Sequence, residues 1–118
     1  MTQEEKKLLL IDLYARIPYG VKVQYYENET FLVDGEVEYV HNDYVKIKNK
    51  DKEVYIMGVK PYLRPMSSMT EEEKDEYDRL VMCNASWVVD DWLNAHHFDF
   101  RNLIERGLAI DCTNLNIY

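Results

Sequence analysis

The residues best suited to chemistry lie in one short run, His96-His97-Phe98-Asp99. Imidazole and carboxylate side chains bind metals and transfer protons near neutral pH. On a helix, however, the adjacent side chains of His96 and His97 point about 100° apart, so they do not easily chelate one ion. The sequence has no HxxxH, HExxH or CxxC spacing, and the third histidine, His41, is remote. We predict a helix boundary here, with no catalytic residue, no metal and no cofactor.

The two cysteines, Cys83 and Cys112, lie far apart and lack a metal-ligand spacing. The chain opens on charged residues, Glu4-Glu5-Lys6-Lys7, and the apolar run that follows, Leu8 to Ile11, is too short for a secretory signal. No apolar run approaches the length of a membrane span. We therefore expect a cytoplasmic protein with two reduced thiols and no membrane partner.

Basic residues gather in the first half of the chain, and they define a possible nucleic-acid contact. Lys46 and Lys48 alternate with apolar neighbours, which places both on one face of a predicted strand. Tyrosines nearby could add base stacking to this charge. Lysines on an edge strand also prevent sheets from associating, and Asp43, Asp51 and Glu53 dilute the charge. The candidate contact residues are Lys46, Lys48, Lys60 and Arg64.

Ten tyrosines give the chain a second possible binding surface. Tyrosine favours strands and is enriched in recognition surfaces, so the aromatic face of a sheet could contact a partner protein. The candidate protein-contact residues are Tyr26, Tyr44, Tyr55 and Tyr62. The two tryptophans, Trp87 and Trp92, are expected to anchor the core.

The net charge of −8 is unevenly distributed along the chain. Residues 1–66 hold 10 Lys and Arg against 11 Asp and Glu, whereas residues 67–118 hold 4 against 11. A phosphate backbone is repelled by such an acidic second half. Nucleic acid is therefore an unlikely partner on charge alone, and contact could come only from the first half.

The elements that position these residues follow from local patterns. Thr2 and Glu5 have the spacing of a capping box, and an apolar face follows at Leu10, Leu13, Tyr14 and Ile17 before Pro18 and Gly20 end the helix. Residues 21–57 alternate apolar and polar residues between closely spaced turns, which predicts five short strands. Asp34-Gly35 is either a tight hairpin turn or a bulge in one long bent strand. The segment from Pro61 to Pro65 is expected to be an extended connector.

Three helices are predicted after this sheet. Thr70 and Glu73 form a second capping box. The next helix begins at Asn84 or Ser86 and carries Trp92 on its apolar stripe, and the last begins at Asp99 and ends at Gly107. Residues 108–110 form a brief strand or a packed tail.

The predicted fold is α+β, with residues 1–118 forming a single domain. It begins with an N-terminal helix, followed by a small strongly curved antiparallel SH3-like sheet or barrel. Residues 1–66 are the β-rich half of this domain. Residues 67–118 are the helical half and carry the three C-terminal helices.

Three longer stretches of the sequence are familiar together: residues 13–23, which include Tyr14-Ala15-Arg16-Ile17-Pro18; residues 59–70, which include Lys60-Pro61-Tyr62-Leu63-Arg64-Pro65; and residues 92–110, which include His97-Phe98-Asp99-Phe100-Arg101. In these stretches the chain resembles a family of small uncharacterised proteins encoded by phages, prophages and mobile elements of gut anaerobic bacteria. The resemblance implies an intracellular bacterial protein that acts in phage or element biology, and it carries over no catalytic or binding residue.

These observations favour a non-catalytic interaction or accessory protein that acts through a protein-binding surface. The alternative is a nucleic-acid-binding module that uses the basic, Tyr-rich face of the curved sheet. An enzyme is the least favoured of the three interpretations, because no coherent set of reacting groups can be named. A deep cavity with convergent polar groups would favour the enzyme.

Overall fold

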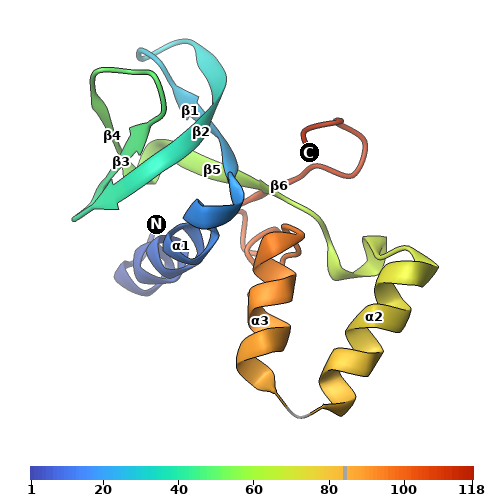
Figure 1. Cartoon of the computed structure of the whole chain (residues 1–118). Helices are drawn as coiled ribbons and strands as arrows, with labels where there is room; N and C mark the ends of the chain where they lie inside the picture. Colours follow the sequence, from blue (N-terminus) through green and yellow to red (C-terminus); the bar gives the residue numbers. More distant parts are fainter. Residues whose placement is uncertain (84) are drawn as a thin grey trace.

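The structure is a computed structural model that describes residues 1–83 and 85–118. In this part of the chain the fold is α+β: one helix, then five strands, then two helices that project as a hairpin, and then a short strand that completes a six-stranded sheet (Figure 1). Asn84, the alternative start of the third helix, lies outside the described residues. Helix α3 begins at Ser86 and runs as Ser86–Ala95.

The two capping boxes predicted from the sequence are confirmed. Helix α1, Gln3–Arg16, begins after Thr2, whose hydroxyl accepts from the Glu5 amide while the Glu5 side chain accepts from the Thr2 amide. Helix α2, Glu71–Met82, begins after Thr70 with the same reciprocal bonds to Glu73. Each box satisfies amide groups that have no partner within the helix, so both helix starts are fixed by local sequence.

The sheet contains six strands in the order β4-β3-β2-β1-β5-β6. All neighbours pair antiparallel except β5 and β6, which pair parallel. Three short 3-10 turns, η1 at Ile17–Tyr19, η2 at Ile56–Gly58 and η3 at Met66–Ser68, connect the elements. The strands are β1 at Lys22–Tyr26, β2 at Leu32–His41, β3 at Tyr44–Ile47, β4 at Glu53–Tyr55, β5 at Val59–Leu63 and β6 at Ile110–Asp111.

Three features of the predicted fold are wrong. The sheet is open rather than a closed SH3-like barrel, because β4 and β6 are its two edges and do not pair with each other. Among the described residues, two α-helices follow β5 rather than three, since the segment from Asp99 to Gly107 forms turns. The predicted connector around Pro61 contains strand β5, where Pro61 lies opposite Val23.

Asp34 and Gly35 lie inside one continuous strand, β2, so the hairpin-turn alternative is wrong. The bulge in this strand falls later, between Val37 and Tyr39. Gly35 is needed for a close approach: a Cβ atom there would lie 2.6 Å from Cγ2 of Ile47 and 3.0 Å from Cε1 of Tyr25, both buried. The glycine therefore lets the first half of β2 pack tightly against the core.

The main core lies between the sheet and α1, rather than under α2 and α3. Leu9 and Leu13 of α1 pack with strand residues such as Val23 and Val45, and Leu103 and Leu108 close the core from the C-terminal segment. A second, smaller cluster of Trp92, Leu93 and Phe98 holds α3 against α2 and η3. Trp92 is 9% exposed, which confirms its predicted burial, whereas Trp87 is 76% exposed and the prediction of a core anchor there is wrong.

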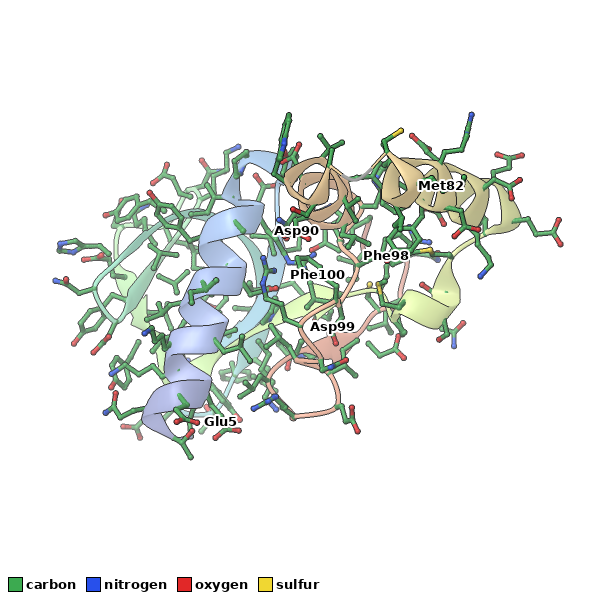
Figure 2. The ribbon with its side chains drawn as sticks, turned by 90° about the horizontal axis from the view of Figure 1, so that it is seen from below. Glu5, Met82, Asp90, Phe98, Asp99 and Phe100 are labelled. Carbon is green, nitrogen blue, oxygen red and sulfur yellow. The ribbon has the colours of Figure 1, made fainter. Side chains whose placement is uncertain are left out.

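An ion-pair network between α1 and the segment after α3 links the sheet domain to the hairpin. Asp12 and Arg16 are fully buried on α1, and Asp12 accepts from Nε of Arg16 at 3.0 Å and from Arg101 at 2.6 Å. Arg16 also donates to the backbone carbonyl of Phe98. In Figure 2 the segment carrying Phe98, Asp99 and Phe100 runs between α1 and the hairpin. The buried face of α1 therefore includes two charged residues, whereas the apolar pattern of the sequence predicts only apolar residues on that face.

No helix in the described residues combines the length and the apolar character needed to cross a membrane.

Candidate interaction surfaces

Three of the four candidate nucleic-acid residues are paired with carboxylates. Nζ of Lys46 lies 3.2 Å from Oε2 of Glu38, and Nζ of Lys48 lies 3.4 Å from Oε2 of Glu36. Arg64 donates to both carboxylate oxygens of Glu73. Lys60 is exposed on β5. Because acidic partners offset most of this charge, these residues do not form a strongly basic surface.

The candidate aromatic residues occupy different places. Tyr44 and Tyr55 are exposed side by side on β3 and β4, with ring centres 5.5 Å apart. Tyr26 is exposed on β1. Tyr62 is buried, so it is not available as a contact residue. Burial, with a hydrogen bond to Asp34, raises the pKa of Tyr62 to about 12.

The run from His96 to Asp99 has a structural role at the end of α3. Nδ1 of His96 donates to the Trp92 carbonyl, and His97 takes a left-handed backbone conformation that stops the helix. Asp99 accepts from the amides of Leu103 and Ile104 at 2.8 and 2.9 Å, so it caps a turn rather than a helix. Within residues 1–83 and 85–118, no three His, Cys, Asp or Glu side chains are arranged to hold a metal ion.

A polar cavity of about 370 Å³ lies beside this run. Burial, aided by nearby positive charges such as Arg16, lowers the pKa of His97 to about 4, so its imidazole is neutral near pH 7. Burial also raises the pKa of the Cys112 thiol, which keeps it protonated. The lining residues are Arg64, Ser68, His96, His97, Cys112, Thr113, Asn116, Ile117 and Tyr118.

The groups around this cavity serve the fold. Tyr118 stacks on His97 with ring centres 3.5 Å apart, and its hydroxyl bonds to the backbone of Lys22 and Tyr62. Arg64 is held by Glu73. Both groups are thus in their neutral forms near pH 7, and a protonated thiol is a weak nucleophile.

A long apolar groove lies between α1 and β2. Its two compartments, of about 500 and 430 Å³, meet at Tyr14 and Val40. Tyr14 is 71% exposed and Ile11 is 50% exposed, because α1 turns its other face, with Leu9 and Leu13, into the core. We call this the Tyr14 groove; it is lined by Leu10, Ile11, Tyr14, Ala15, Ile17, Pro18, Glu38, Tyr39, Val40 and Asn42.

One side of the Tyr14 groove is an open edge of strand β2. Strand β1 pairs with β2 only as far as Lys22 opposite Glu36, with one further bond from the Val37 amide to the Val21 carbonyl. Beyond the bulge, residues 39–41 pair with β3 on their other side. Among the described residues, no strand pairs with 38–41 on the edge that faces the groove. Open strand edges are sites at which another extended segment can pair.

The α2–α3 hairpin presents a different surface. It projects away from the sheet (Figure 1), and α2 has no fully buried residue. At its tip, Met82 is 84% exposed and Trp87 is 76% exposed. We call Val81, Met82, Ala85, Ser86, Trp87 and Val89 the hairpin tip.

Searches against protein-family models, curated proteins and solved structures gave no match to this chain. The resemblance to phage and mobile-element proteins therefore stays a prediction.

Sequence reasoning misses both the Tyr14 groove and the hairpin tip. An apolar helix pattern places Tyr14 on a buried face, and the aromatic character of Trp87 predicts a core anchor, whereas both side chains are exposed. The sequence holds no signal for this arrangement, because a charged i,i+4 pair such as Asp12 and Arg16 is normally exposed, whereas here it is buried and the apolar stripe beside it is exposed.

Proposed function

We propose that this protein is a non-catalytic interaction module that binds an extended segment of a partner protein in the Tyr14 groove. The observation that supports this function is the coincidence of a large apolar groove with an open strand edge. An apolar groove supplies pockets for side chains, and a strand edge supplies backbone hydrogen bonds for an added strand.

The geometry suggests how such a segment would bind. Its backbone would pair with residues 38–41 of β2, and alternate side chains would then point to the same face. Those side chains would enter the two compartments of the groove on either side of Tyr14. Tyrosine provides a large contact area with little loss of conformational entropy, which suits a central contact residue.

In this proposal the partner belongs to the phage, the mobile element or its host cell, as the resemblance implies, and the protein acts in the cytoplasm. The nucleic-acid alternative is less favoured, because three of its four residues are paired with carboxylates.

The test is site-specific photo-crosslinking in cells that express the protein naturally, followed by mass spectrometry. A photoreactive amino acid replaces Tyr14 in one variant and Phe31 in a matched control. Phe31 is also an exposed aromatic residue, but it precedes β2 at the far end of that strand. We expect a defined crosslinked protein from position 14 only.

A second pair of variants removes the side chain rather than labelling it. Tyr14→Ser should abolish capture of that partner, whereas Phe31→Ser should retain it. Equal capture by both variants would refute the groove as the binding site.

A further inference from the structure

The outer surfaces of α2 and α3 share one arrangement, with apolar residues at the hairpin tip and carboxylates behind them. On α2, Asp75, Asp78 and Met82 follow at helical spacing and therefore lie on one stripe. On α3, Trp87 is followed at the same spacing by Asp90 and by Asp91, whose carboxylate accepts from the Tyr19 hydroxyl. Figure 2 labels Met82 and Asp90 on the two helices of the hairpin.

A small groove lies between the two helices at the tip. Its volume is about 260 Å³, and Val81 and Val89 form opposite walls from α2 and α3. Asp90 contributes a carboxylate to the same groove. An apolar centre with a charged rim is the usual composition of a protein–protein contact.

The charge of the hairpin decides what can bind there. Residues 71–95 contain eight Asp and Glu against two Lys and Arg. A second copy of the chain would bring an equally acidic hairpin, so charge repulsion disfavours self-association through this surface. A basic partner is attracted by the same field.

We propose that the hairpin tip binds a basic amphipathic helix of a partner protein. The apolar face of that helix packs on Met82, Trp87 and the groove between Val81 and Val89. Its Lys and Arg residues pair with the carboxylates of Asp75, Asp78 and Asp90. This surface is separate from the Tyr14 groove, and the proposal does not depend on the function assigned to that groove.

The test measures the binding of a labelled amphipathic helical peptide of leucine and lysine, about 18 residues or five turns long, by fluorescence anisotropy. A peptide in which glutamate replaces lysine is the charge control. We expect the lysine peptide to bind, its affinity to fall with added salt, and the glutamate peptide not to bind.

Two sets of variants separate specific docking from general attraction to an acidic protein. Met82→Ser with Trp87→Ser keeps every charge, and Phe31→Ser is the matched control that removes an exposed aromatic elsewhere. We expect about tenfold weaker binding for the tip variant and no change for the control. Asp75→Asn with Asp78→Asn should reduce the salt dependence.

Tyr14→Ser should bind the lysine peptide as wild type does, which distinguishes this surface from the Tyr14 groove. Equal affinities of the tip variant and Phe31→Ser would overturn the proposal, as would the absence of binding at about 100 μM peptide, a concentration well above that of a useful interaction.

Discussion

Arg64 and Glu73 join the sheet to the hairpin: the guanidinium donates to both carboxylate oxygens, at 2.8 and 2.7 Å, and lies 4.2 Å from the centre of the Phe98 ring. Glu73 also completes the cap of α2. One carboxylate therefore fixes both the start of this helix and its attachment to the end of β5.

This pair predicts a pH dependence of stability. The bond from Arg64 lowers the pKa of Glu73 from 4.5 to about 2. A depressed carboxyl pKa stabilises the folded state above pH 4.5, and the stabilisation is lost as the pH falls from there toward 2. Glu73→Gln should lower the free energy of unfolding by roughly 1 to 3 kcal/mol near pH 7, and the difference from wild type should shrink below pH 4.5. An unchanged difference at about pH 3 would contradict this role.

The two tryptophans should respond differently to truncation. Trp92→Ala removes a buried ring that contacts Tyr77 and Phe98, and it should cost about 3 to 5 kcal/mol. Trp87→Ala changes an exposed side chain and should alter stability by about 0.5 kcal/mol or less. Chemical denaturation of both variants measures the contrast, and similar losses would show that Trp87 is packed.

The buried pair of Asp12 and Arg16 should be far more sensitive than a surface pair. Asp12→Ala leaves Arg16 charged in the core and should cost about 3 to 5 kcal/mol. Asp43→Ala breaks the partly exposed pair with Lys6 and should lower stability far less. In the double variant Asp12→Leu, Arg16→Met, much of the loss should be recovered, because no fully buried charge is left unpaired. Arg101 also loses Asp12, but it is 16% exposed and keeps its hydrogen bond to Asn94. Thermal unfolding of these variants beside wild type tests this order.

Gly35→Ala should destabilise the sheet by roughly 1 to 3 kcal/mol, because its Cβ would meet buried Ile47 and Tyr25 at close range. Gly58→Ala is the matched control, since the nearest side-chain atom would lie 3.9 Å away on Tyr26. Equal denaturation midpoints for the two variants would show that the core yields to the added methyl group.

We expect no measurable binding of generic DNA or RNA at micromolar protein and about 150 mM salt, where only close ionic contacts persist. Lys46, Lys48 and Arg64 are paired with carboxylates, so few phosphate contacts are available. Anisotropy across a salt series is the measurement. Micromolar binding that Lys46→Glu with Lys48→Glu abolishes would instead favour the nucleic-acid alternative.

Local signals predict the helix starts and most strands, because capping boxes and alternation act over a few residues. They miss strand β5, because Pro61 lacks an amide hydrogen and therefore suggests a connector. In the structure Pro61 lies within this strand, opposite Val23 of β1. Closure of the sheet and the number of later helices depend on long-range packing, which no short pattern encodes.

The exposure of the Tyr14 groove and of the hairpin tip could not be predicted for a related reason. Leu10, Leu13 and Tyr14 fit one apolar helix face, but the buried face of α1 also includes Asp12 and Arg16, whose partners Arg101 and Phe98 come from the other end of the chain. Without those partners, a charged buried face has no sequence signature. Trp87 and Trp92 likewise belong to the same helix but lie on different faces of it, and residue type alone, which predicts burial for both, does not separate them.

The chain leaves the sheet after Leu63 and returns beside it at Ile110, where β5 and β6 pair in parallel. The hairpin is thus an excursion between two adjacent strands, with its own small cluster around Trp92. Lengthening such an excursion costs little, about 0.6 kcal/mol for each doubling of a flexible loop. The pairing of β5 with β6 therefore loses little chain entropy when residues are inserted at the exposed end of the hairpin, which makes that end a tolerant place for insertions.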